Sequence, residues 1–439
     1  MTGRRLNAST GLLATSALLL TGCATAGTDG NNDDEPLEVS DQVTDDDVTL
    51  RLAYVDDPPT EALVEGFMEE HPNITIETEQ TDFTNYVSSI TRSMSSDDAP
   101  DIAQYNPGAM RSLVPAGHIM DLTDYSELYD WEESFPPASL EQLMSDDEAQ
   151  EFGTGGLYAA PGSLSVLGVY YNAEVLAEAG IDSPPDDLDE FEEALDAVAD
   201  TDAAPLSLGN LEVGGIHLWN AVLNTLGDRD EYLDWVYGAS GATIETDAAQ
   251  EAALTLDEWT DAGYISSGAN ATSDADALAD FTSGDSAFHV TGNWNASAVE
   301  EELGEDAGFF VLPGDEAEAA PVASGSSVAY SISAGTEHPD EAAAFLEWLN
   351  SPDAAEIQVE AGFMPVDTEA DVAEDELLGD VAEAFTPVAE EDNIVPFPDF
   401  ASPGMGDVLT SGLQGVVSGE QEAEEFLASL QEAWSDHHE

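Results

Sequence analysis

The pattern of hydrophobic and polar positions predicts alternating strands and helices in the first ordered part of the chain. Apolar and polar residues alternate over 48–54, which predicts a strand, and apolar residues recur at helical spacing over 60–68. A second strand is expected at 74–78, a second helix at 86–94 and a third strand at 101–105. This β-α-β-α-β order is typical of a parallel α/β sheet with right-handed crossovers.

The same alternation continues towards the carboxyl end. Residues 157–172 are strand-like, residues 186–200 and 248–263 have helical spacing, and residues 339–349 predict a helix that opens with proline. No repeat of solenoid or propeller period occurs. The length is too great for one average domain and suits two, so we expect an α/β protein in two parts.

The amino-terminal residues have the features of a lipoprotein signal peptide, expected over residues 1–22. Arg4 and Arg5 precede an apolar stretch that is too short to span a bilayer. The four residues Leu-Thr-Gly-Cys that end at Cys23 resemble a lipobox, and Cys23 is the single cysteine of the chain. We therefore expect lipidation at Cys23 and a cell-surface location on the extracellular side of the membrane. An ordinary buried cysteine is the alternative.

The charge balance narrows the choice of partners. The chain has 94 acidic residues against 6 arginines and no lysine, and loss of residues 1–22 with two arginines would leave 94 against 4, or −90. Repulsion among so many like charges is screened at high salt, so a salt-adapted, halophilic protein is expected. The 42% hydrophobic content is sufficient for a core and argues against disorder. Nucleic acid is excluded because phosphate neutralisation needs clustered Lys and Arg.

A set of short segments occurs in a characteristic order along the chain, at 100–105, 156–161, 169–172, 281–288, 292–294, 324–332, 341–349, 351–353 and 362–366. Taken together, these segments resemble the extracellular solute-binding proteins of ABC importers, in the sugar-binding group that includes maltose-binding protein. The resemblance implies a periplasmic-binding-protein-like fold of two α/β lobes joined by a hinge of crossing strands. It also implies a monomer without cofactor that captures a sugar between its lobes, closes on it and delivers it to the permease.

The resemblance also implies boundaries for the lobes. Residues 47–160 and 324–362 would form the first lobe, and residues 161–323 and 363–439 the second. The small, polar and acidic residues 23–46 are expected to form a flexible linker between the lipid anchor and the lobes.

Candidate ligand contacts follow from the chemistry of sugars and from the family pattern. Sugars need flat aromatic platforms and polar groups for their hydroxyls, and ligands of α/β sheets lie beyond the carboxyl ends of the strands. By similarity, Tyr105 is the first-lobe platform, Trp294 the second-lobe platform, and Tyr158 lies at the first hinge crossing. Further candidates are Asp56, Asp57, Asn106, Ser163, Asn210, Trp219, Ser326, Phe397 and Phe400. Four other tryptophans, Trp235, Trp259, Trp348 and Trp434, occupy apolar positions of helical patterns and are assigned to packing.

Other functions stay open as alternatives. The first loop has no basic residue, which argues against anionic solutes and leaves neutral solutes or cationic ones such as polyamines or peptides. A secreted glycoside hydrolase would need two carboxylates about 5–9 Å apart, and the sequence cannot exclude such a pair. No catalytic motif is present, so we expect a protein that is not an enzyme. The histidines are scattered apart from His437 and His438, which argues against a metal site.

Overall fold

The computed structural model describes residues 39–55, 58–314, 320–365 and 377–439. Cys23, Asp56 and Asp57 lie outside these ranges. Within them, no helix has both the length and the apolar character needed to cross a membrane.

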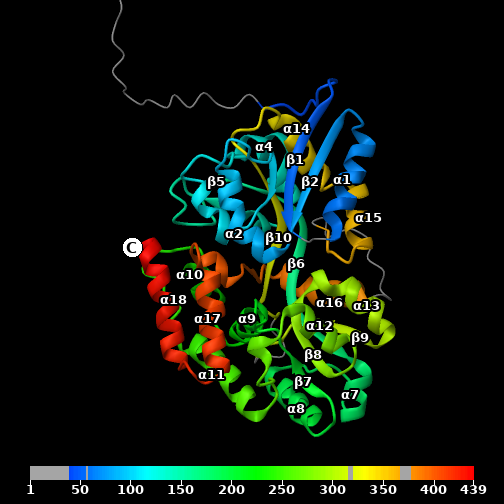
Figure 1. Cartoon of the computed structure of the whole chain (residues 1–439), viewed down its shortest axis with the longest axis vertical. Helices are drawn as coiled ribbons and strands as arrows, with labels where there is room; N and C mark the ends of the chain where they lie inside the picture. Colours follow the sequence, from blue (N-terminus) through cyan, green and yellow to red (C-terminus); the bar gives the residue numbers. More distant parts are fainter. Residues whose placement is uncertain (1–38, 56–57, 315–319, 366–376) are drawn as a thin grey trace, which may run out of the picture. The chain divides into compact units, whose positions relative to one another are not determined.

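A mixed sheet runs through the described chain (Figure 1). Its order is β2 (Ile74–Thr81), β1 (Val48–Val55), β3 (Ile102–Gln104), β10 (Ala323–Ile332), β6 (Ala160–Asn172), β8 (Ser286–Gly292) and β7 (Ala204–Ser207), with β11 (Ile394–Val395) on β10 and β9 (Ala307–Phe310) on β6. Strand β1 is parallel to β2 and β3, and β7 is parallel to β8. A separate pair joins β4 (Met144–Ser145) to β5 (Gly156–Leu157).

The first hydrophobic core, which we call the first core, surrounds β1, β2 and β3. Phe67 is fully buried there and meets Phe345 and Trp348 edge-on, with ring centroids 5.3 and 6.0 Å apart. Its helices are α1 (Pro58–Glu70), α2 (Phe83–Met94), α3 (Pro107–Met110), η1 (Arg111–Leu113), α4 (Thr123–Tyr129), α5 (Trp131–Ser134), α6 (Pro137–Glu141), α14 (Pro339–Trp348) and α15 (Pro352–Glu360). Two distant stretches of chain thus build one core.

The second core forms around β7 and β8, and it is where most of the remaining helices pack. They are α7 (Ala173–Ala179), α8 (Leu188–Ala199), α9 (Gly214–Leu226), α10 (Arg229–Val236), α11 (Asp247–Ala262), η2 (Ala269–Ala271), η5 (Pro398–Ala401), α17 (Met405–Val417) and α18 (Ala423–His438). A third, smaller cluster joins β9 to neighbouring helices. The helices beside it are α12 (Asp274–Thr282), η3 (Asn293–Asn295), α13 (Ala296–Leu303), η4 (Gly304–Asp306) and α16 (Leu377–Glu390).

Strands β6 and β10 connect the two cores. They pair antiparallel from Gly325↔Val166 to Tyr330↔Ala160, with a register shift between Ser327 and Ala329. Beyond this stretch β10 pairs with β3 on one side, while β6 pairs with β8 and β9 on the other. These are strands that cross from one core to the other.

The predicted elements agree well with this architecture. The strand expected at 48–54 is β1, the helices expected at 186–200 and 248–263 are α8 and α11, and the proline-opened helix is α14. The stretch 157–172 was expected as one strand, and it is instead divided between β5 and β6.

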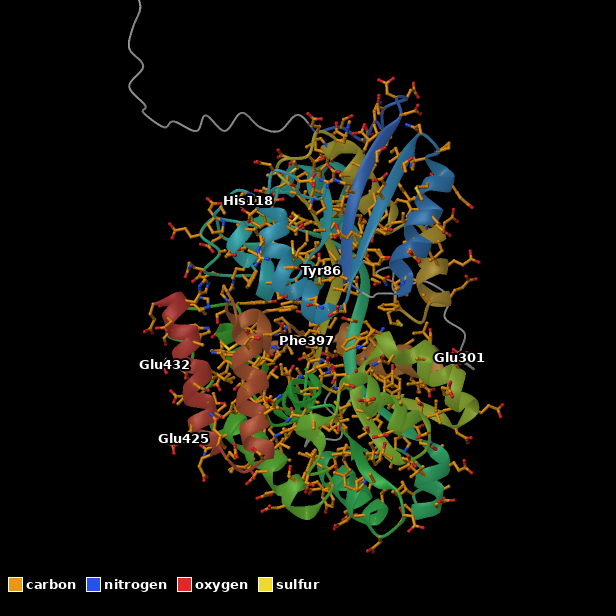
Figure 2. All side chains as sticks on the ribbon, in the orientation of Figure 1. Tyr86, His118, Glu301, Phe397, Glu425 and Glu432 are labelled. Atoms are coloured by element: carbon orange, nitrogen blue, oxygen red, sulfur yellow. The ribbon has the colours of Figure 1, made fainter. Side chains whose placement is uncertain are left out.

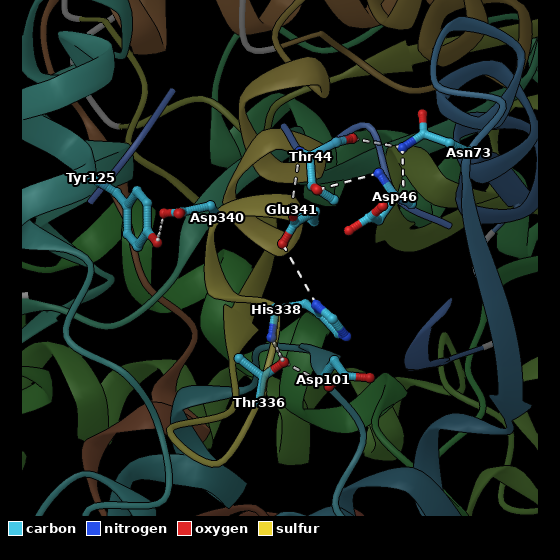
Figure 3. A network of polar contacts seen from close by, with 9 residues as sticks. All are labelled: Thr44, Asp46, Asn73, Asp101, Tyr125, Thr336, His338, Asp340 and Glu341. Carbon is cyan, nitrogen blue, oxygen red and sulfur yellow. Dashed lines mark hydrogen bonds and ion pairs between the residues drawn. The ribbon is translucent and has the colours of Figure 1, made fainter. Parts of the chain in front are cut away.

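The segment that precedes β1 is tied to the first core by hydrogen bonds (Figure 3). The backbone N–H of Thr44 donates to Glu341 Oε1 at 3.3 Å, and Asn73 Nδ2 donates to the carbonyl of Thr44 at 2.8 Å. The flexible linker expected over residues 23–46 therefore differs from the structure in its last residues, from 39 onward. Composition alone does not reveal these contacts, because they come from side chains remote in sequence.

Acidic side chains line the outside of the molecule. Glu301, Glu425 and Glu432 are exposed and point away from the ribbon (Figure 2). Among the described residues, arginine ion pairs are confined to Arg51 and Arg229. The described carboxylates therefore greatly outnumber the arginine side chains that could pair with them.

Candidate ligand-binding site

The parallel strands β7 and β8 end at the same edge of the sheet, and Trp294 follows the end of β8. Asn293 holds this turn in place, since its Oδ1 accepts from Val166 N at 2.9 Å and its Nδ2 donates to Leu164 O at 3.3 Å. A Cβ atom on Gly292 would lie 1.8 Å from Cζ3 of Trp294, so only glycine lets the indole lie over the strand end. The local sequence therefore positions this ring precisely.

Three half-buried rings gather at this edge and form what we call the aromatic cluster: Trp294, His217 and Phe397. The ring centroids of His217 and Trp294 are 5.5 Å apart, those of His217 and Phe397 6.0 Å, and those of Trp294 and Phe397 6.3 Å. Phe400 is buried behind Phe397 at 6.1 Å. Rings that keep part of their surface free can stack on the apolar face of a ligand.

The electrostatics of the aromatic cluster are set by burial. Burial, together with nearby His289, lowers the pKa of His217 to about 4, so the imidazole is neutral near pH 7. Asp399 lies on η5 between Phe397 and Phe400, and burial raises the pKa of its carboxyl to about 6. The cluster thus combines apolar ring faces with a neutral imidazole, and η5 beside it carries one carboxyl group, that of Asp399.

Three predicted ligand contacts lie around the first core and not beside β7 and β8: Tyr105, Asn106 and Tyr158. Tyr105 follows β3 and is buried, with its backbone N–H bonded to Ala329 O at 2.7 Å, and burial raises the pKa of its hydroxyl. Asn106 caps α3, since its Oδ1 accepts from Ala109 N at 2.8 Å. Tyr158 is buried, and burial raises its pKa to about 12.

Helix α3 brings the first core close to the aromatic cluster. A Cβ atom on Gly108 would lie 2.8 Å from the carbonyl oxygen of Asp399, so the backbone of α3 lies directly against η5. Helix α3, which begins just after Tyr105 and Asn106, therefore meets η5, which begins just after Phe397 of the aromatic cluster.

The other predicted contacts lie elsewhere. Ser163 is buried in β6, and the carbonyl of Ser326 accepts from Ser165 Oγ at 2.8 Å where β6 and β10 cross. Asn210 is fully buried and donates to Asn270 Oδ1 at 2.7 Å. Trp219 is fully buried in the second core, edge-on to Phe426 at 5.3 Å. The structure does not bring Asn210 or Trp219 to the aromatic cluster, because packing encloses both.

His217 is the member of the aromatic cluster that the sequence did not single out. It lies in the first turn of α9, the helix that follows β7. A polar aromatic residue in the first turn of a helix that follows a strand of the sheet was the signal that could have indicated it, since ligands bind beyond the carboxyl ends of such strands.

Within the described ranges, no group of three or more His, Cys, Asp or Glu side chains could hold a metal ion.

Comparison with known proteins gives the family. A family model described as bacterial extracellular solute-binding protein matches residues 62–410, most of the chain. The chain belongs to this family. As a solute-binding protein, it works at the outer side of the cell membrane, and it is a binding protein and not an enzyme.

Individual proteins also resemble this chain in sequence or in fold. This solute-binding protein is 22% identical over 366 residues to the multiple sugar-binding protein of Streptococcus mutans. The alignment covers 81% of each chain. A solved chitin oligosaccharide binding protein matches with a TM-score of 0.72 at 21% identity, over 89% of this chain and 98% of that one. The GacH receptor of Streptomyces glaucescens, solved unliganded and with acarbose, matches with a TM-score of 0.69 at 21% sequence identity. This match covers 89% of the present chain and 98% of the receptor chain. These likenesses confirm the predicted two-lobed fold.

Proposed function

We propose that this protein captures a neutral carbohydrate, a mono- or oligosaccharide, between two α/β lobes and delivers it to the permease of an ABC importer. The observation that carries the proposal is the aromatic cluster of Trp294, His217 and Phe397, three partly exposed rings at the carboxyl edge of β7 and β8. The sugars named for the relatives are consistent with it.

The proposed mechanism is closure of the lobes on the sugar. The first lobe would comprise residues 47–160 and 324–362, and the second residues 161–323 and 363–439. The division is supported by the two hydrophobic cores, and β6 and β10 provide the crossing strands about which the lobes would turn. A ligand that contacts both lobes stabilises the closed form by its differential affinity.

A cationic solute is the second candidate. An amine would need several carboxylates around one aromatic ring, whereas a sugar needs several rings with separated polar groups. The aromatic cluster brings three rings together, and η5 beside it carries one carboxyl group, that of Asp399, which favours the sugar.

Lipid anchoring through Cys23 and adaptation to salt complete the proposal. A lipid on Cys23 would keep the monomeric protein beside the permease, outside the membrane. Substrate held there is released into the permease when the lobes reopen.

Calorimetry tests the proposal on the purified protein in high salt, against a panel of sugars, polyols and polyamines. We expect a sugar to bind and Trp294→Ala to weaken its binding by about 1–3 kcal/mol, because the indole face would be lost as a platform. Tyr264→Ala is the matched control, since this half-buried ring is held by Asp196 outside the aromatic cluster and its loss should leave affinity unchanged. Binding of polyamines alone would contradict the carbohydrate assignment, and unchanged affinity in folded Trp294→Ala would remove Trp294 from the site.

A further inference from the structure

Arg111 is a fully buried cation at the contact between the two cores. It lies in η1 beside α3, and its Nη1 donates to the carbonyl of Ala401 on η5 at 2.9 Å. Its guanidinium carbon lies 3.7 Å from the centre of the Phe152 ring. The guanidinium therefore has one carbonyl and one aromatic face as partners, and both are uncharged.

The remaining edge of the guanidinium has no partner. Within the described part of the chain, Nε and Nη2 of Arg111 are buried without a hydrogen bond, and no carboxylate lies within ion-pair distance of them. Asp146 is the acidic residue whose charge reaches Arg111, but its Oδ1 already accepts from Gln150 N and Glu151 N at 2.6 and 2.9 Å. The charge is thus buried without a carboxylate in ion-pair contact among the described residues.

Such an arrangement is costly unless something compensates it. A buried ion without a partner costs several kcal/mol, and arginine stays protonated near neutral pH. Burial lowers the pKa of Arg111 to about 9, which leaves it charged at pH 7. The imidazoles of His437 and His438 lie nearby and cannot supply a negative charge. Burial, together with the positive charge of Arg111, lowers the pKa of both imidazoles.

The geometry suits a single small anion. The Nε–H and Nη2–H bonds of a guanidinium point in parallel from one edge and form a fork for an acceptor. The hydroxyl of Tyr105, which interacts electrostatically with Arg111, is also buried without a partner among the described residues. Ser402, next to Ala401, has a buried hydroxyl of the same kind. Each of these groups can donate a hydrogen bond, and each is buried without an acceptor among the described residues.

We propose that the Nε–H and Nη2–H groups of Arg111, with the Tyr105 hydroxyl, bind a halide ion, chloride in saline surroundings, at the contact between η1 and η5. The carbonyl oxygen of Ala401 is contacted by Arg111 and also by His438, whose Nε2 lies 2.8 Å from it. The halide neutralises the buried guanidinium and so stabilises this contact. The observations on Arg111 do not depend on the sugar-binding proposal, although Tyr105 is also the sugar platform predicted for the first lobe.

Crystals of the full chain grown in sodium bromide test the site directly. We expect an anomalous bromide peak within hydrogen-bonding distance of Arg111 Nε and Nη2. Density without anomalous signal at that position, from a water molecule or from a rotated Asp146 carboxylate, would overturn the proposal.

Thermal unfolding gives the second test. At equal ionic strength, chloride should raise the Tm by roughly 2–4 °C over gluconate, an anion too large for the site. The difference should vanish in Arg111→Met and persist in Arg229→Met, which removes a partly exposed, ion-paired arginine. An equal chloride effect in Arg111→Met would count against the site. Should Arg111→Met not fold, Tyr105→Phe can be used instead, because it removes one proposed donor. This variant should need a several-fold higher chloride concentration than the wild type for the same rise in Tm. An unchanged chloride requirement would contradict the proposed coordination.

Discussion

Burial changes the acid-base behaviour of two neighbouring histidines, His217 and His289. His289 is almost fully buried, with Nδ1 3.1 Å from Ser207 O and its ring stacked on Phe281 at 5.8 Å. Burial lowers its pKa from 6.5 to about 4. As pH falls from 6.5 towards 4, the unfolded chain therefore takes up a proton that the folded protein refuses.

We expect His289→Gln to remove one source of acid sensitivity. Below pH 6.5 the wild-type residue should lower the free energy of unfolding by about 1.4 kcal/mol per pH unit until pH 4, and glutamine, which does not titrate, should not. Urea unfolding at constant salt from pH 7 to 4.5 measures the difference between the two proteins. The free energy of unfolding of the variant should rise relative to that of the wild type as pH falls.

The difference in unfolding free energy between the two proteins is compared, because other groups change stability in the opposite direction as pH falls. Burial raises the pKa of Asp274 and of Asp399 to about 6, so these carboxyls favour folding more at acid pH than at neutral pH. His118→Gln, at a half-exposed position, is the control and should run parallel to the wild type. A His289→Gln curve that also ran parallel would contradict the prediction.

The tryptophans show how far residue patterns predict the site. The four assigned to packing are buried, as predicted: Trp235, Trp259, Trp348 and Trp434. Trp294, flanked by glycine and asparagine, keeps part of its surface free. Trp219 was named as a cleft residue, yet it lies in the second core, and His217 two positions earlier faces the cluster. Adjacent positions on one helix face different ways, and the sequence alone does not say which face meets the ligand.

Among the elements, β6 depends on close backbone approach to β9. A Cβ atom on Gly168 would lie 2.2 Å from Phe309 Cζ and 2.7 Å from the carbonyl oxygen of Phe310. The backbone oxygen cannot move without disturbing the β6–β9 pairing.

Gly168→Ala should therefore lower the free energy of unfolding by about 1–3 kcal/mol, because overpacking forces neighbouring atoms apart. Denaturant unfolding measures this. Gly335→Ala is the matched control, since its new methyl group would meet its nearest neighbour, Ser333 Oγ, at 3.7 Å. Equal stability of the two variants would show that β6 and β9 can separate at little cost.

Strand pairing marks the limit of prediction at this scale. Alternation located β1 and the spacing of apolar residues located α8 and α11, because these signals are local. The antiparallel pairing of β6 with β10 joins residues about 160 positions apart, such as Gly325 and Val166. No local pattern specifies such a partner.

For the whole molecule, charge repulsion should dominate the response to salt. The chain has a formal net charge of −88, and the described arginines form few ion pairs. We expect the Tm to fall on dilution from about 2 M salt to ~0.02 M, where the screening length grows from a few ångströms to roughly 20–30 Å. Scanning calorimetry in either sodium chloride or sodium gluconate measures this, since screening depends on ionic strength and not on the anion. The same Tm at both extremes would contradict salt adaptation.

The sequence by itself determined the α/β class, most of the regular elements of the first core, the acidic surface and the family resemblance. These properties depend on composition, on local periodicity and on short segments read in order. Only the tertiary structure decided that His217, Trp294 and Phe397 form one cluster, that Asn210 and Trp219 are enclosed by packing, and that Arg111 is buried against Ala401. The physical reason is that burial and side-chain contact depend on which distant segments meet, and those meetings are set by the packing of the whole chain.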